Sequence, residues 1–504
     1  MPSMDPTLLQ DLANQNQWGA IAPELMLGCL ALLLLVLEIL LPKESHKHIP
    51  GFAVVGILGI ILGFAINYNS VLIGSETFNG LLHHSVQGQL MRLFFLICAL
   101  LVCVLGMITL PKQKVPRVEF YNIILVVSAA MMLLVQSHNF VMFFVSLETI
   151  TIGFYILVSY FRTSTASLEA GLKYLISGAL SSSILLFGIV LLYGVAGNAA
   201  LVGHTGMAMD FSAMADFLRQ NPHNFLASIG IVMVLAGVAF KIGAFPFQIW
   251  IPDVYEGAPT AVTAFLAVGS KAAGFGILMV LTTHVFRSYD WLVCPVLTAM
   301  AGATILFGNL AALTQHNVKR LIGLSGVSHA GFLLLGVVAS AKAPLGFNAV
   351  YFYLYTYMIA SFAVFGVMAH VATSDDSNQE LDSYAGLSRE NPFLAAILAI
   401  GLGSLAGIPP LAGFMGKFFI FIATFQSGHW ELLLIAVIGV VISIYYYFGW
   451  IRAAFFDSRI AGQGEPRPAL LVSPGARFTL LLLALGSVAL GFYQGPFGVW
   501  LASR

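Results

Sequence analysis

A succession of long apolar runs constrains this chain more than any other feature of its sequence. A membrane-spanning helix needs about 20 predominantly apolar residues, and about fourteen such runs follow one another along the 504 residues. Only 9% of the residues are charged, against about 25% in a typical soluble domain. The sequence therefore predicts an all-α, polytopic membrane protein with about fourteen transmembrane helices. The runs lie near residues 19–41, 51–69, 90–110, 118–136, 139–161, 167–194, 225–256, 259–283, 291–313, 319–339, 346–371, 392–427, 430–456 and 478–501.

The distribution of Lys and Arg predicts how these helices are oriented, because short basic loops stay on the cytoplasmic side. With the N-terminus outside, 13 of the 22 Lys and Arg residues fall in inner loops and 5 in outer segments. Both termini are then expected on the periplasmic side of a bacterial inner (plasma) membrane. The remaining 4 lie inside the apolar runs themselves.

Those four residues are Lys173, Lys241, Lys271 and Lys417, and Glu148 lies within a run as well. A charge at the centre of a bilayer costs about 2.5–3.5 kcal/mol, so four unpaired lysines would cost about 10–14 kcal/mol. Lys173 is close to a helix end, where a side chain that reaches the interface is an equally good interpretation. For the others, the sequence favours a function over a structural ion pair.

Proton transfer is the chemistry that suits buried lysines and carboxylates. Removal from water destabilises a protonated lysine and a nearby carboxylate stabilises it, so a movable ion pair can load and release a proton. A pair between Glu148 and either Lys241 or Lys173 is the corresponding hypothesis.

Two of the long runs contain helix-breaking prolines beside a lysine. Pro246 follows Lys241 by five residues, and Pro409 and Pro410 precede Lys417 by seven. Proline removes a backbone donor and disrupts the helix. Such breaks in corresponding halves of a transporter indicate an ion path, so we expect both runs to be broken within the membrane.

A histidine lies about ten residues into the run that begins at 319. His329 could pass protons through its two ring nitrogens, with Ser325 and Ser328 extending a hydrogen-bonded chain, although a satisfied core histidine fits nearly as well. Lys319 and Arg320 are expected to be a basic interfacial anchor. Other polar residues near helix ends are predicted to be interfacial: Glu24, Glu38 and His284.

Several function classes have no support in the sequence. The formal net charge of zero offers no basic face for a nucleic-acid partner. No P-loop, GxGxxG after a strand, CxxC or HExxH is present. We therefore expect no cofactor in this chain, and a proton path driven either by an ion gradient or by another subunit.

Four segments resemble a known family. They are FKIGAFPFQIWIPDVYEGAPTAVTAFLAVGSKAAGF, GNLAAL, KRLIGLSGVSHAGF and SLAGIPPLAGFMGKF. Together they resemble subunit N of respiratory complex I, the proton-pumping NADH:quinone oxidoreductase, over residues 118–456. The chain is less similar to the sister subunits L and M, which carry a histidine-containing segment where this chain has AVGSKAAGF.

The resemblance implies two inverted five-helix repeats, each with a broken helix. The chain then divides into an N-terminal three-helix segment (1–117), a first repeat (118–283), a second repeat (284–456) and a C-terminal helix (457–504).

The resemblance also implies roles for the buried residues. Glu148 and Lys241 would form a modulating pair, Lys271 the centre of a hydrophilic axis, Lys417 its continuation and Lys173 part of a cytoplasmic access route. Other membrane-arm subunits, M and K among them, and the lipid bilayer would be partners, with FMN, iron–sulfur clusters and quinone held by partner subunits.

The sequence departs from the family pattern at two places. Gln248 stands where the family commonly has histidine, and it cannot carry a proton as histidine does. GLSG replaces the usual AYSS, with Leu324 and Gly326 in place of a tyrosine and a serine. An Mrp-like cation/proton antiporter and a structural membrane-arm subunit with static ion pairs remain the alternative functions.

Overall fold

The computed structural model describes residues 16–66, 73–112, 115, 117–373, 375–377, 379–456 and 470–495. The predicted periplasmic placement of the two chain ends concerns residues outside these ranges. The described part is almost entirely helical, with one short hairpin of β1 (Glu76–Thr77) and β2 (Leu82–His83).

The helices follow one another with short connections. The longer ones are α2 (Ala22–Leu40), α3 (Ile49–Ile66), α4 (Val86–Thr109), α5 (Val118–Leu134), α6 (Phe140–Val158), α7 (Thr165–Ala196), α9 (Phe225–Ile242), α13 (Asp290–Ala312), α14 (Val318–Ser340), α15 (Pro344–Val371), α17 (Pro392–Ala406), α18 (Ala412–Gln426), α19 (Trp430–Phe456) and α20 (Pro474–Phe492). Shorter helices are α8 (Phe211–Gln220), α10 (Ile251–Gly257), α11 (Thr260–Phe265), α12 (Lys271–Val280) and α16 (Leu387–Glu390). The π-helical turns η5 (Leu266–Ser270) and η6 (Leu281–Val285) join α11 and α12 into one continuous helix over 260–285.

Within the described residues, each of the fourteen predicted runs contains helix. Twelve helices of the described chain are long and apolar enough to cross a membrane. The run at 118–136 is a single helix of 17 residues, and the run at 392–427 consists of two helices of 15 residues each. The predicted all-α membrane fold is therefore confirmed, and the count of fourteen is compatible with the structure.

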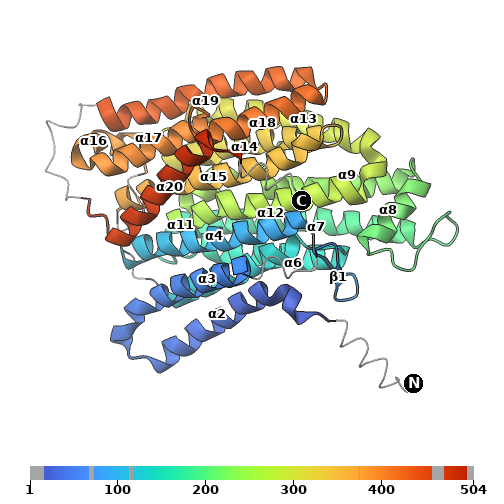
Figure 1. The fold of residues 1–504 in the computed structure, drawn as a ribbon, viewed down its shortest axis with the longest axis horizontal. Helices are drawn as coiled ribbons and strands as arrows, with labels where there is room; N and C mark the ends of the chain where they lie inside the picture. Colours follow the sequence, from blue (N-terminus) through green and yellow to red (C-terminus); the bar gives the residue numbers. More distant parts are fainter. Residues whose placement is uncertain are drawn as a thin grey trace.

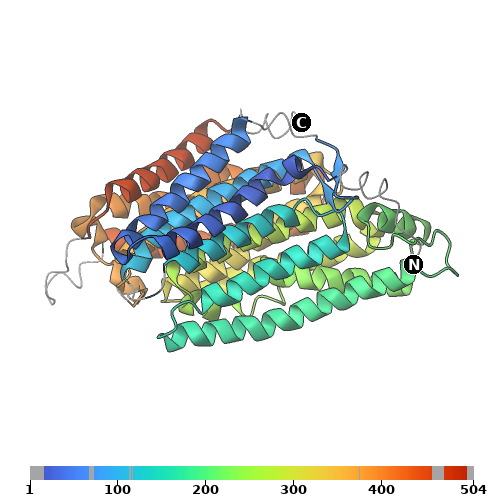
Figure 2. The ribbon, with the colours of Figure 1, turned by 90° about the horizontal axis from the view of Figure 1, so that it is seen from below.

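The helices pack side by side as one bundle (Figures 1 and 2). In Figure 1, α2 lies at one edge and α19 at the opposite edge, while β1 and α8 mark one end of the bundle and α16 the other. The residues of α14 and α15 are nearly all buried. In contrast, α2, α3, α7 and α20 expose many large apolar side chains, as helices that face lipid or a neighbouring membrane protein do.

The helix breaks occur where the prolines predict them. Helix α9 ends at Ile242 and is followed by Gly243 in the left-handed conformation, with φ of 71°. Helix α17 ends at Ala406 in the same way, followed by Gly407 with φ of 84°. Glycine tolerates this conformation and ends a helix cleanly. Both breaks leave carbonyl groups at the end of a half-helix inside the bundle.

A buried ion pair joins the first helix to the bundle. Glu24 of α2 and Arg92 of α4 are almost fully buried, and their side chains are 2.5 Å apart. Gln136 also donates to the Glu24 carboxylate, at 2.9 Å. The prediction that Glu24 is interfacial is therefore wrong, because a partner on another helix lets the carboxylate enter the packed interior near the helix end. Glu38, at the other end of α2, is partly exposed.

We expect the Glu24→Gln variant to unfold more easily, because it leaves the Arg92 guanidinium buried without its countercharge. Breaking a buried pair from one side costs about 3–5 kcal/mol. Thermal unfolding of the purified protein measures the effect. The double change Glu24→Gln and Arg92→Gln should recover part of the loss, and equal stability of Glu24→Gln and the parent chain would contradict a stabilising pair.

Candidate functional site

Lys241 lies in the last turn of α9, just before the first helix break. Its side chain is 5% exposed, and its ammonium group donates to the hydroxyl of Thr151 on α6. The ring of Tyr174 lies 5.9 Å from the nitrogen. A cation at the carboxyl end of a helix is stabilised by the helix dipole. The break therefore supplies a favourable position for a charge that hydrocarbon alone would not tolerate.

Glu148 lies on the same helix as Thr151, three residues earlier and so on the same face. Its carboxylate accepts a hydrogen bond from Ser182 of α7, at 2.5 Å. In the described part of the chain no Lys or Arg nitrogen lies within 4.0 Å of this carboxylate. The structure thus holds Glu148 one helical turn from the threonine that binds Lys241, without a direct ion pair between the two charged groups.

Lys173 belongs to a different part of the molecule. Its side chain is 45% exposed on α7 and pairs with Glu169 and Asp253, both at 2.7 Å. Asp253, on α10, also pairs with Arg320 of α14 at 2.9 Å. The hypothetical pair of Glu148 with Lys173 is absent, and Lys173 instead belongs to an ion network that ties α10, the second half of the broken helix, to its neighbours.

Lys271 lies at the centre of the bundle, directly after the π-helical turn η5. The side chain is 2% exposed, its ammonium group donates to the carbonyl of Gly326 on α14, and the nitrogen lies 5.4 Å from the centre of the Tyr357 ring. A Cβ atom at position 326 would come within 2.9 Å of that nitrogen. Gly326, the second glycine of GLSG, therefore leaves the space that the lysine nitrogen occupies.

Lys417 lies on α18, just after the second helix break. It is 3% exposed and donates to the carbonyls of Leu405 and Ala406, at 2.9 and 3.0 Å. These carbonyls end α17, so here too a half-helix end binds a cation. The ring of Phe332 lies 5.0 Å from the nitrogen.

His329 is buried between two tyrosines. Its Nδ1 lies 2.5 Å from the hydroxyl of Tyr353 on α15, and its Nε2 lies 3.0 Å from the hydroxyl of Tyr447 on α19. The structure differs in detail from the predicted hydrogen-bonded chain that runs from His329 through Ser325 and Ser328. Ser325 donates to a backbone carbonyl, and Ser328 accepts from Asn309 at 2.7 Å. The ring is thus a fully bonded core histidine and also the middle of a tyrosine–histidine–tyrosine chain.

A single face of α14 connects the central lysines. Gly326, His329 and Phe332 follow one another at intervals of three residues, so they lie along one side of the helix. Gly326 contacts Lys271, and Phe332 contacts Lys417.

On the other side of Lys271, a Cβ atom at Gly274 would lie 3.6 Å from the Cβ of Lys241. Helix α12 therefore links Lys241 to Lys271. The structure thus places Lys271, His329 and Lys417 along α14, with Lys241 packed against α12 and Glu148 on α6, one helical turn from the Thr151 that binds Lys241.

Lys241, Lys271 and Lys417 have no carboxylate partner within 4.0 Å in the described residues. Hydroxyl and carbonyl oxygens take that place. Neutral oxygen atoms accept hydrogen bonds from the protonated ammonium group. When the lysine loses its proton, no buried carboxylate is left with an unpaired charge. The arrangement is therefore able to hold a lysine in either protonation state.

One charged residue at the start of α14 differs from the sequence prediction. Lys319 is 2% exposed and pairs with Asp376 at 2.5 Å, so it is not an interfacial anchor. Asp376 also accepts from the backbone N–H and hydroxyl of Thr260, and so caps the start of α11. Asp376 is 57 residues from Lys319 along the chain, so no local sequence pattern predicts this pair.

Gln248 lies in the first helix break and is 2% exposed, with its side-chain oxygen lacking a hydrogen-bond partner among the described residues. The same part of the chain contains no group of three or more His, Cys, Asp and Glu residues that could hold a metal ion.

Comparisons with known proteins agree with this geometry. Residues 137–443 match the family model described as NADH:quinone oxidoreductase/Mrp antiporter, TM. The chain is 63% identical to NADH-quinone oxidoreductase subunit N 1 of Opitutus terrae, covering 99% of this chain and 100% of that protein. It is 36% identical to subunit N of Desulfitobacterium hafniense, covering 94% and 96% of the two chains.

Solved structures have the same fold. A chain of respiratory complex I from Thermus thermophilus with bound aureothin superimposes with a TM-score of 0.76 at 28% identity, covering 94% of this chain and 98% of that one. A chain of the Mrp complex from Dietzia superimposes with a TM-score of 0.77 at 19% identity, covering 96% of each chain, and shares the fold alone. The full-length identity to the subunit N proteins and the matched family model together show that this chain belongs to the subunit N family of NADH-quinone oxidoreductase, respiratory complex I.

Proposed function

We propose that this chain translocates protons as subunit N of a bacterial NADH-quinone oxidoreductase, and that Glu148, Lys241, Lys271, His329 and Lys417 carry the protons. The observation that carries the proposal is the burial of three lysines inside the bundle, on α9, α12 and α18. Each ammonium group of these lysines is bound by oxygen atoms that bear no net charge. A permanent ion pair in each place would hold the proton instead of passing it on.

Electron transfer takes place in partner subunits under this proposal. The chain would lie beside other membrane-arm subunits, M and K among them, while FMN, iron–sulfur clusters and quinone belong to the partners. Glu148 and Ser182 are partly exposed on α6 and α7, among exposed apolar side chains of the same helices. A partly exposed carboxylate at this place supports a protein neighbour there.

The two broken helices support the division into two repeats, 118–283 and 284–456. Each repeat contains one half-helix end beside a buried lysine: Lys241 lies in the last turn of α9, and Lys417 donates to the carbonyls that end α17. Residues 1–117 and 457–504 flank the repeats. We also propose the orientation that the Lys and Arg bias predicts, in a bacterial inner membrane, with β1 and α8 at the periplasmic end. Lys173 would serve the cytoplasmic access route, through its network with Asp253 and Arg320.

Replacement of Lys271 by arginine tests the need for a removable proton. Arginine keeps the charge but does not deprotonate in proteins, so we expect Lys271→Arg to lower NADH-driven proton translocation at least fivefold in the reconstituted complex. Lys342→Arg, at an exposed turn after α14, is the matched control and should translocate normally. Full translocation by Lys271→Arg would contradict the proposed role.

Replacement of Lys241 by alanine separates proton transfer from a structural role. We expect the complex to assemble, to reduce quinone with NADH and to translocate fewer protons per NADH oxidised. The measurements are subunit content in mild detergent and the proton-to-electron ratio in liposomes. Loss of assembly, with an unchanged ratio in whatever complex forms, would instead support a structural subunit with static charges.

A further inference from the structure

A second group of titratable residues lies at the end of the bundle marked by β1 and α8, away from Lys241, Lys271 and Lys417. His83, His138 and His284, with Glu76, line a cavity of about 260 Å³. The rings of His83 and His138 have centroids 5.4 Å apart, and Nε2 of His138 lies 3.4 Å from Glu76 and 2.8 Å from the hydroxyl of Ser212. We call this cavity the histidine chamber.

The lining of the histidine chamber shows that water belongs in it. Gln136 is 1% exposed and lines the chamber, yet its side-chain oxygen has no hydrogen-bond partner, and the same holds for Nδ1 of His83. Buried polar atoms of this kind are normally bonded to ordered water. The volume has room for several water molecules at about 30 Å³ each.

The inner wall of the chamber is built from the two helices that surround Lys271. Gly276 and Val280 of α12 line it, as does Tyr351 of α15. Gly276 follows Lys271 by five residues on one helix, about 7.5 Å along its axis, and Tyr351 precedes Tyr357 by six on the other, about 9 Å. Lys271 and the chamber are therefore separated by roughly two helical turns.

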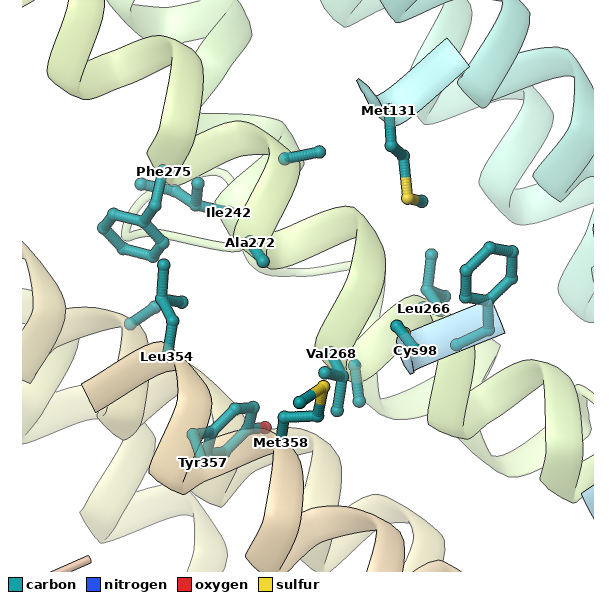
Figure 3. Packing of buried hydrophobic residues seen from close by; sticks show 14 of the residues in the cluster. Cys98, Met131, Ile242, Leu266, Val268, Ala272, Phe275, Leu354, Tyr357 and Met358 are labelled. Carbon is teal, nitrogen blue, oxygen red and sulfur yellow. The ribbon is translucent and has the colours of Figure 1, made fainter. Parts of the chain in front are cut away.

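Apolar side chains also join α12 and α15. Figure 3 shows Phe275 of α12 beside Leu354 of α15, and both side chains are buried. Under the proposal below, apolar packing of this kind would close the path between Lys271 and the chamber. A pump requires such a closure, because a proton path open at both ends at once would dissipate the gradient that the pump builds.

Burial favours the neutral form of the rings in this region. Burial lowers the pKa of His138, and burial together with the nearby Arg92 guanidinium lowers the pKa of His84. The other charged or titratable groups that face the rings are Glu76, Asp210 and His83 at His138, His83, His138 and Arg287 at His284, and Glu24 and His83 at His84. Negative and positive groups are thus mixed around the rings.

We propose that the histidine chamber is a proton-release site of this subunit, in which His83, His138 and His284 accept protons that leave Lys271 and hand them to the periplasmic solvent. This inference rests on the proposed proton translocation, and it names an exit within this chain. The second helix break around Lys417 would then not be the only way out.

The test replaces the three rings together and restores proton transfer chemically. We expect the triple variant His83→Gln, His138→Gln and His284→Gln in the reconstituted complex to translocate protons at least threefold more slowly. Imidazole added to the compartment that receives the protons should restore most of the rate, because a free base can enter an open chamber. His204→Gln, at an exposed histidine of an outer loop, is the control and should behave like the parent.

The outcomes separate this inference from the proposed function. An unchanged rate in the triple variant, or a loss that imidazole does not restore in an assembled complex, would overturn the release site. If Lys271→Arg is at the same time inactive in translocation, proton transport by the subunit stands and only the exit is wrong. If the Lys271→Arg variant and the triple variant both translocate protons normally, then both the release site and the proposed function are wrong.

Discussion

The protein depends on keeping positive charge inside hydrocarbon without neutralising it permanently. Lys241, Lys271 and Lys417 are each bound by hydroxyl or carbonyl oxygens and not by a carboxylate within 4.0 Å in the described structure. Backbone carbonyls are available for this purpose only where a helix is broken or where a neighbouring helix comes very close. The broken helices and the glycine at position 326 are therefore direct consequences of the need to hold these charges.

The ion pairs of the molecule have the opposite character and lie elsewhere. Glu24 with Arg92 and Lys319 with Asp376 are buried and directly bonded, each near an end of the bundle. Pairs of this kind hold helices and loops in place, and a proton bound there is not easily released. The bundle thus contains two kinds of buried charge, ion pairs near its ends and lysines without a carboxylate partner across its middle.

The position of α14 explains how distant sequence segments come together. Gly326, His329 and Phe332 lie on one face of this fully buried helix, between Lys271 and Lys417. His329 also joins α15 to α19 through two tyrosine hydroxyls. Motion of α14 relative to its neighbours would alter several of these contacts together, which is a way for a change at one lysine to reach the next.

The sequence by itself determined the helical membrane fold, the places of both helix breaks and three of the buried lysines, Lys241, Lys271 and Lys417, because hydropathy, proline and charge act locally along the chain. Only the tertiary structure decided which groups meet. Thr151 rather than Glu148 contacts Lys241, and Asp376 reaches Lys319 across the fold. The burial of Glu24 and the gathering of histidines from three separate segments were likewise invisible in the sequence, because they depend on how helices distant along the chain pack together.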